Sequence, residues 1–324
     1  VEANKEGEHS VIWYVQPKNI PDFPLKDEVK WTNSIQEIYD FSPDVLFVPC
    51  NIVPYYLPGV KIQIFHGYAA EKKDHWVIRR YFDTYFTQGP FFTEGFKALA
   101  KKYKDFEVVE TGWPRQDWIY ENLHTFDAEK NALLRKHQKS KLALYAPTFS
   151  PSLTSLPFIK AREKDVLLIL KFHPLTRSEW MEEYRQLAEE HENMLWVEDH
   201  NITKYQIMAD VMISDTSSTV YEFLLLDKPV ITYKTIAKDI YWLDIQHPED
   251  LPDAFDLVLQ DTVLASKRKW IIDNYDPYLD GKVCHRMLDA ARDYISRHGV
   301  PKKRKLNLWR KYTSIKKFGK VKRR

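Results

Sequence analysis

The chain has 324 residues, of which 44% are hydrophobic and 14% aromatic, and its formal net charge is +2. This length is too great for one ordinary α/β unit and suits two domains of about 150 residues each. No apolar run approaches the roughly 20 residues of a membrane-spanning helix, which excludes an integral helical membrane protein and leaves a soluble or peripheral one. Only Cys50 and Cys284 are present, which excludes a disulfide framework and favours a reducing, cytoplasmic compartment.

Charge is distributed unevenly along the chain. Residues 297–324 contain 13 Lys and Arg and no Asp or Glu, whereas residues 1–296 carry a formal charge of −11. An acidic body therefore precedes a basic tail. No signal peptide is recognisable and the first residue is Val1 rather than Met, so we expect a fragment or a trimmed start.

Strand-like runs alternate with helical periodicity through most of the sequence. In the first part they occupy residues 11–16, 44–49, 60–65, 84–88 and 106–111, and a helix-like segment begins at Pro90. After a polar helix over residues 127–140, a second set occupies residues 141–147, 166–172, 194–199, 210–215 and 229–234. This alternation predicts parallel βαβ units, and we expect an α/β protein with two doubly wound domains.

The expected organisation has four parts. They are a first domain over residues 1–138, a second over 139–275, a helix packing across both domains over 276–300, and a basic tail over 301–324. In open parallel sheets, ligands bind beyond the carboxyl ends of the strands, so the residues after each strand are site candidates. These are "FHG" (65–67), "TGWPRQD" (111–117), "APTFS" (146–150), "KFHP" (171–174) and "SDTSS" (214–218). We expect their polar groups to meet in a cleft between the domains.

A run of hydroxyl residues stands where a buried strand passes into an apolar helix: Thr216, Ser217, Ser218 and Thr219. A plain helix cap, from Asp215 or Ser217, needs only one such residue. A helix N-terminus with adjacent hydroxyls is also an anion site, so we favour a cradle for a phosphate. Glu222, one turn further on, could accept hydrogen bonds from ribose hydroxyls or be a solvated glutamate.

Two histidines follow strands at the same predicted edge. His66 ends a buried strand before a glycine, and an imidazole there suits removal of a proton from an attacking hydroxyl. His173 and Lys171 could neutralise a diphosphate or protonate its leaving oxygen, and Arg115 could clamp a phosphate. The alternative for each of these residues is an ordinary structural or surface role.

We expect no metal ion and no other cofactor, because no Asp-x-Asp or His/Cys ligand set stands near these loops. The tail over residues 301–324 interleaves basic and apolar side chains, with Leu308, Tyr312, Ile315 and Phe318 sharing a helical face. Such a segment can lie on an anionic membrane, each basic residue contributing about 1 kcal/mol. Nucleic acid is the rival partner, but the acidic body and the lack of a nucleic-acid module favour a membrane. A disordered solubilising tail is the remaining alternative.

Seven stretches together resemble the CDP-glycerol glycerophosphotransferase family, the teichoic acid glycerol-phosphate primases and polymerases. Their order and spacing agree over about residues 10–295. The stretches are "FHG" (65–67), "TGWPRQD" (111–117), "YAPTF" (145–149), "KFHP" (171–174), "ISDTSSTVYE" (213–222), "KPVITY" (228–233) and "DGKVCHRMLDA" (280–290).

The resemblance implies a GT-B architecture, in which two Rossmann-like domains face a cleft and the second domain holds CDP-glycerol. It implies transfer of glycerol phosphate to a hydroxyl of a membrane-linked glycan in teichoic acid or capsule biosynthesis, with release of CMP, at the cytoplasmic face of the cell membrane. By motif match, His66 is the expected general base and His173 acts on the diphosphate. The expected donor-binding residues are Arg115, Thr148, Lys171, Asp215, Thr216, Ser217, Ser218, Thr219 and Glu222.

The chain departs from the family pattern after its first His-Gly pair. The family usually continues with a Thr-Pro-Leu-Lys-like stretch, where this chain has "YAAEKK" (68–73). The donor could therefore be CDP-glycerol, CDP-ribitol, another CDP-alditol or a nucleotide sugar. Two other hypotheses share the fold: a GT-B glycosyltransferase or UDP-sugar 2-epimerase, and a non-catalytic membrane-bound scaffold.

Overall fold

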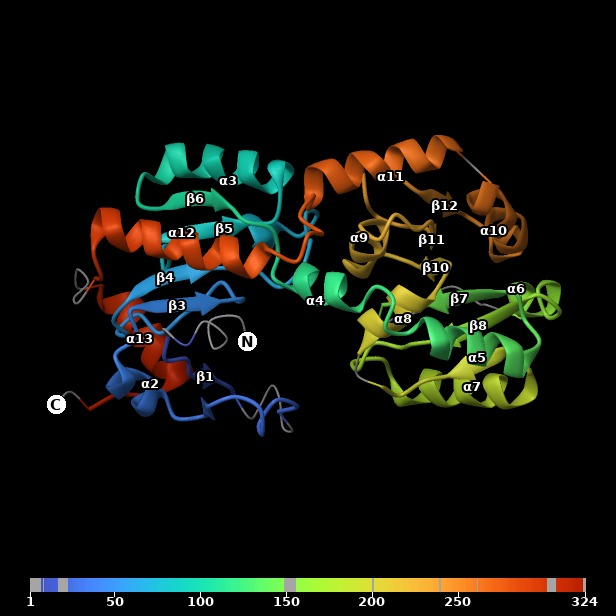
Figure 1. The fold of residues 1–324 in the computed structure, drawn as a ribbon, viewed down its shortest axis with the longest axis horizontal. Helices are drawn as coiled ribbons and strands as arrows, with labels where there is room; N and C mark the ends of the chain where they lie inside the picture. The colour runs from blue at the N-terminus through green and yellow to red at the C-terminus, as the bar shows by residue number, and fades with distance from the viewer. Residues whose placement is uncertain are drawn as a thin grey trace. The chain divides into compact units, whose positions relative to one another are not determined.

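A computed structural model describes residues 7, 9–16, 23–148, 156–199, 201–238, 240–260, 262–301 and 307–322. The chain forms two compact units, each an α/β structure (Figure 1). Unit 1 comprises the described residues of Val1–His66, Lys72–Pro114 and Lys282–Arg324, and unit 2 comprises those of Gly67–Glu71 and Arg115–Gly281. Residues 115–138, which we expected to close the first domain, therefore group with unit 2.

The sheet of unit 2 has six parallel strands in the order β12-β11-β10-β7-β8-β9. The strands are β7 (Lys141–Tyr145), β8 (Val166–Leu170), β9 (Met194–Trp196), β10 (Val211–Ser214), β11 (Val230–Tyr233) and β12 (Leu243–Ile245). The chain winds outward from β7 to β9, returns to β10 beside β7, and winds outward the other way. This is the order of a Rossmann fold, and its switch point lies between β7 and β10.

Burial on both faces of this sheet explains why its strands read as continuous apolar runs. All five residues of β8 are buried. The helices of unit 2 are α4 (Arg115–Asn122), α5 (Asp127–His137), α6 (Leu156–Ala161), α7 (Ser178–Glu190), α8 (Ile202–Met208), α9 (Thr219–Leu224), α10 (Leu251–Gln260) and α11 (Thr262–Tyr275), with a 3-10 turn, η2 (Pro248–Asp250). Phe158 of α6 and Phe255 of α10 are examples of helical residues in the core beneath the sheet.

Unit 1 contains a four-stranded parallel sheet in the order β3-β4-β5-β6 and a separate parallel pair, β1 and β2. The strands are β1 (Trp13–Tyr14), β2 (Trp31–Thr32), β3 (Val45–Val48), β4 (Val60–Gln63), β5 (Thr84–Thr87) and β6 (Glu107–Glu110). The helices are α2 (Ile35–Phe41), α3 (Pro90–Tyr103), α12 (Val283–His298) and α13 (Leu308–Phe318), with a 3-10 turn, η1 (Lys73–Trp76). Pro90 occupies the first turn of α3, as predicted.

All ten predicted strands are confirmed, and every strand pair in both units is parallel. The prediction omits β2 and β12. These strands have two and three residues, too few to show a periodic pattern. The predicted α/β class is correct.

The basic tail contains the predicted helix, α13, and this helix packs on unit 1 beside α2 (Figure 1). Phe318 contacts the buried cluster of Ile35, Ile38 and Leu57. The buried hydroxyl of Ser314 accepts a hydrogen bond from the backbone N–H of Tyr55 at 3.0 Å. The predicted shared face is therefore divided: Phe318 packs against this cluster, whereas Leu308 and Tyr312 are exposed.

Candidate active site

At the switch point of the unit 2 sheet, hydrogen bonds join the loop after β7 to the loop after β10. Thr148, after β7, donates hydrogen bonds from its backbone N–H and its hydroxyl to the Asp215 carboxylate, at 3.0 and 2.8 Å. Asp215 follows β10 and is buried, and burial raises its pKa. The two residues were expected to bind a donor. Because they bind each other, they fix the distance between the two loops that border the predicted ligand edge.

The hydroxyl run lies directly beyond Asp215, at the start of α9. Ser218, and not Asp215 or Ser217, is the N-cap residue, and its side chain makes no capping hydrogen bond. The Ser217 hydroxyl pairs with that of Thr219 at 2.8 Å and accepts from the Thr219 N–H at 3.3 Å. Thr216 accepts from the backbone N–H of Ile236 at 3.1 Å. The run thus organises its own loop, and Ser218 is the member whose hydroxyl serves neither the cap nor the loop's internal pairs.

Glu222 and Arg115 form an ion pair within unit 2, with Nη1 and Oε2 3.2 Å apart. Arg115 also donates to Thr203 of α8. The Glu222 carboxylate is only 6% exposed, and its burial raises its pKa while Arg115 opposes that shift. The arrangement therefore places an arginine predicted to bind phosphate beside a glutamate predicted to bind ribose, and Glu222 is not the solvated glutamate of the alternative.

Gly67, the residue that follows His66, belongs to unit 2 and lies against this group. A Cβ atom at Gly67 would stand 3.9 Å from both the Glu222 Oε1 atom and the Ser218 Oγ atom. The φ angle of Gly67 is +143°, a value that favours glycine over residues with a side chain.

The backbone at His66 is held in an uncommon conformation. Phe65 has a φ of +59°, which a residue with a side chain adopts only under constraint. Its buried ring stacks on His75 at 4.8 Å and meets Phe96 edge-on at 5.0 Å. Burial lowers the pKa of His75 to about 4, so this ring is a neutral packing element near pH 7.

Hydrogen bonding assigns a tautomer to His66. Its Nδ1 atom lies 3.1 Å from the carbonyl oxygen of Pro49, which can only accept. In the neutral ring, Nδ1 therefore carries the proton and Nε2 the lone pair. An exposed imidazole with a fixed Nδ1–H and an open Nε2 has the form that a general base requires.

Lys171 and His173 follow β8, next to the switch point. Lys171 is 8% exposed, and burial lowers its pKa. Among the described residues its ammonium donates one hydrogen bond, to the Phe172 carbonyl at 3.3 Å. His173 is exposed, and its Nδ1 accepts from the Leu175 N–H at 3.0 Å. The His173 proton therefore resides on Nε2 in the neutral ring, and the site holds a buried cation beside a possible proton donor.

A buried network in the same unit escaped the sequence analysis. The Tyr68 hydroxyl donates to Asp276 at 2.6 Å and accepts from Gln116 at 3.0 Å, and all three side chains are buried. Tyr68 stands directly after the His-Gly pair, which was the only local signal. Its partners lie far along the chain, so sequence spacing could not indicate them.

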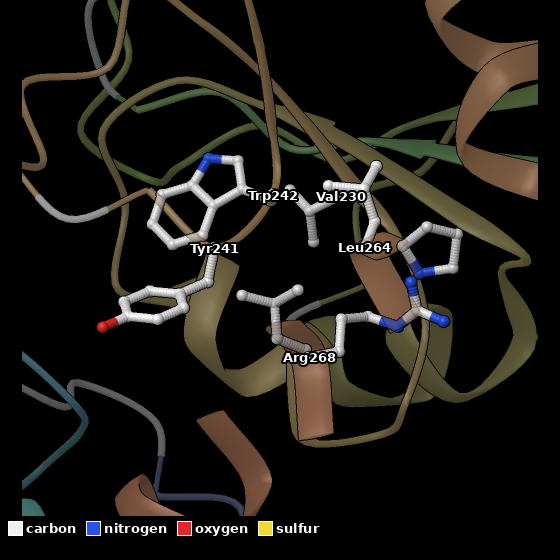
Figure 2. A pocket seen from close by; sticks show the side chains of 7 residues that line it. Val230, Tyr241, Trp242, Leu264 and Arg268 are labelled. Carbon is white, nitrogen blue, oxygen red and sulfur yellow. The ribbon is translucent and has the colours of Figure 1, made fainter. Parts of the chain in front are cut away.

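Two hollows in unit 2 lie away from this group. One is bordered by Tyr241, Trp242 and Arg268 (Figure 2) and is too tight to admit a water molecule, whereas ordinary ligand sites have volumes of about 300 Å³ or more. The other, of about 620 Å³, is lined by residues that include Lys136, His137 and Lys164 at the amino ends of the strands. Ligands of doubly wound sheets bind at the opposite edge.

Neither a spanning helix nor a metal cluster is found in the described ranges. None of their helices is long and apolar enough to cross a bilayer. They also contain no group of three or more His, Cys, Asp or Glu side chains placed to hold a metal ion.

Similarity to solved structures defines the class of protein. The wall teichoic acid polymerase TagF, solved as a variant soaked with CDPG, matches with a TM-score of 0.58 and 18% identity, covering 78% of this chain and 72% of that one. The UDP-GlcNAc 2-epimerase of Neisseria meningitidis, bound to UDP-GlcNAc, matches with a TM-score of 0.62 and 13% identity. The match covers 90% of this chain and 94% of the epimerase chain. With its two parallel α/β units, the chain has the GT-B fold, as the resemblance implied.

Sequence comparison identifies the family. Residues 59–241 match the family described as CDP-Glycerol:Poly(glycerophosphate) glycerophosphotransferase. The chain belongs to this family, which confirms the resemblance drawn from the seven motifs. The teichoic acid glycerol-phosphate primase of Bacillus spizizenii is 32% identical over 156 residues, covering 43% of this chain and 38% of the relative. The teichoic acid ribitol-phosphate primase of the same organism is 25% identical, over 78% of this chain and 74% of the relative. The aligned part thus spans well under half of the first relative's length.

Proposed function

We propose that the protein transfers glycerol phosphate, or a related alditol phosphate, from a CDP-activated donor to a hydroxyl of a membrane-linked glycan, with release of CMP. Membership of the family supports this function. The observation that carries it is the position of Gly67: the residue after the proposed base lies against Ser218 and Glu222, which we assign to the donor site.

The proposed step is a phosphoryl transfer. The acceptor hydroxyl oxygen bonds to the phosphorus of the alditol phosphate, and its proton passes to Nε2 of His66. The bond from that phosphorus to the oxygen of the CMP phosphate breaks, and CMP leaves with the electron pair. The residues that surround such a reaction act mainly by positioning and charge compensation.

Charge compensation falls to the groups after β8 and β10. Burial disfavours the Lys171 ammonium more than the Asp199 carboxylate favours it, so Lys171 is suited to an anion that enters the site. His173 can donate from Nε2 to the leaving phosphate oxygen. We assign phosphate contacts to Ser217 and Ser218. Thr148, Asp215, Thr216 and Thr219 shape the loops, while Arg115 and Glu222 border the nucleotide.

The function is tested with CDP-glycerol, CDP-ribitol and a lipid-linked acceptor, by following CMP release. His66→Ala should lower kcat by about 10²- to 10⁴-fold, the usual contribution of a general base, and leave the melting temperature unchanged because the ring is exposed. His124→Ala is the matched control, since His124 is exposed and, among the described residues, pairs with Asp127 on its own segment. Full turnover by His66→Ala would contradict the assigned base.

Nucleotide preference separates this function from a sugar-nucleotide enzyme with the same fold. The family predicts thermal stabilisation by CDP and CMP derivatives. Selective stabilisation by UDP-sugars would contradict a CDP-activated donor.

We also propose that the protein works at the cytoplasmic face of the cell membrane through α13. The exposed Leu308 and Trp309 accompany six basic residues within 307–322, a composition that suits an anionic lipid surface.

A further inference from the structure

We propose that Tyr68 and Asp276 form a buried anchor that positions His66 for proton transfer. The anchor fixes the short segment Gly67–Glu71, called the strap here, to unit 2. This inference rests on the proposed function, since it concerns the base of that reaction.

The strap belongs to a different unit from the residues on either side of it. His66 before it and Lys72 after it belong to unit 1, whereas its five residues belong to unit 2. Its contacts within unit 2 occur at both ends. A segment of five residues that is held at both ends leaves its neighbours little freedom, because each residue of chain spans at most about 3.6 Å.

The first attachment is Tyr68. Its side chain is completely buried, and its hydroxyl lies 2.6 Å from Asp276 Oδ2 and 3.0 Å from Gln116 Nε2. Asp276 directly follows α11, and Gln116 lies in the first turn of α4. Burial and the adjacent Asp276 carboxylate raise the pKa of Tyr68 well above its usual value, so the hydroxyl remains a donor. A short hydrogen bond to a carboxylate is among the stronger neutral-to-charged contacts.

The second attachment is Glu71. Its carboxylate accepts a hydrogen bond from the hydroxyl of Tyr221 in α9. The Tyr221 ring is 4% exposed and stacks on Tyr275 at 4.8 Å, the residue before Asp276. Both attachments of the strap therefore lead to α9 and the end of α11, and α9 carries Glu222.

These contacts link the anchor to the base. The Tyr68 hydroxyl is hydrogen-bonded to Asp276 and Gln116, which are not among the residues assigned to phosphate, and Tyr68 stands two residues after His66. Loss of the Tyr68 hydroxyl should leave the donor site intact and loosen the strap. A misplacement of about 1 Å can lower a rate by 10²-fold, so the effect should appear in kcat and not in donor KM.

The test is Tyr68→Phe in the full chain, assayed for CMP release with CDP-glycerol and acceptor. We expect kcat to fall by about 10- to 100-fold, with donor KM within about twofold of the starting protein. Tyr184→Phe is the matched control, because Tyr184 is a buried tyrosine of unit 2 in the sheet core, away from the strap. It should change the melting temperature by a similar amount and leave kcat unchanged.

Asp276→Asn keeps the shape of the anchor but removes its charge. It should lower kcat less than Tyr68→Phe does. The kcat of the double variant should be no lower than that of Tyr68→Phe alone, since both changes affect the same interaction. If Tyr68→Phe does not fold, Tyr221→Phe tests the other attachment by the same split of kcat from KM.

Three results would contradict the proposed anchor. The first is an unchanged kcat in folded Tyr68→Phe. The others are a loss of kcat that Tyr184→Phe reproduces, and a rise in donor KM without a fall in kcat. Absence of CMP release by the unsubstituted protein with every CDP-alditol contradicts the proposed function instead.

Discussion

At the scale of single residues, Lys171 shows how burial can indicate a ligand. The ammonium is 8% exposed and contacts one carbonyl among the described residues. Burial therefore disfavours its charged form, as the lowered pKa indicates. The Asp199 carboxylate opposes this effect only in part, and a bound diphosphate would offset the remaining penalty.

Lys171→Met should therefore separate binding from stability. We expect donor Kd, measured by calorimetry with CDP-glycerol, to rise by at least about 10-fold, because hydrogen bonds to charged groups contribute about 1.5–3 kcal/mol. The melting temperature should stay equal or rise, because the variant no longer buries a charge. Lys164→Met, at an exposed position of the same unit, is the control. An unchanged Kd would remove Lys171 from the donor site.

Sequence reasoning correctly located residues that follow the end of a strand. His66, Lys171, His173 and Asp215 all stand where buried apolar runs stop, and the structure places each beyond a strand. It failed for side-chain partners. Thr148 and Asp215 are 67 residues apart, and Tyr68 and Asp276 are 208 apart. Contacts at such separations depend on the packing of the whole unit, which local patterns do not contain.

At the scale of elements, α8 shows how a half-buried lysine can satisfy the carbonyls at the end of a helix. Lys228, two residues before β11, donates from Nζ to the carbonyls of Gln206 and Ile207 at the last turn of α8. These carbonyls have no partner within the helix. The same helix carries Thr203 toward Arg115, so its end fixes part of the candidate site. Burial lowers the pKa of Lys228 to about 8.

This shift predicts a pH dependence of the free energy of unfolding. Between about pH 8 and the ordinary lysine pKa of 10.5, the unfolded chain binds more protons than the folded one, so stability rises with pH. The gain from pH 7 to 9.5 should be about 2 kcal/mol. Urea titrations of Lys228→Met should lack this rise, whereas those of Lys269→Met, an exposed lysine, should keep it. Equal slopes in Lys228→Met and the unsubstituted protein would contradict the assignment.

Strand prediction worked at this scale because parallel strands covered on both faces give continuous apolar runs. The same reasoning did not predict that the strap belongs to unit 2. Residues 67–71 contain no periodic pattern, and their assignment to unit 2 depends on buried polar contacts. Local patterns also could not show that the boundary lies before residue 138, because α4 joins unit 2 through the side-chain contacts of Arg115 and Gln116.

At the scale of the whole molecule, the uneven charge selects the surface that can meet an anionic membrane. Residues 1–296 carry a formal charge of −11, which an anionic bilayer repels. Residues 307–322 combine six basic side chains with the exposed Leu308, Trp309 and Tyr312. Because α13 is docked on unit 1 through Ser314 and Phe318, it would present this surface as part of a folded unit.

The complete chain should therefore sediment with vesicles rich in phosphatidylglycerol and remain free of vesicles of phosphatidylcholine. Changing Leu308, Trp309 and Tyr312 together to Ser should weaken binding by at least about 10-fold, since each buried apolar side chain contributes about 1.5–3 kcal/mol. Raising the salt concentration should weaken it too, because each basic residue near the surface contributes about 1 kcal/mol through a screened interaction. Leu257→Ser removes an exposed apolar side chain from α10 of unit 2, and this variant should bind as the unsubstituted protein does. Binding that survives the triple change, or that ignores lipid charge, would show that α13 is not the membrane contact.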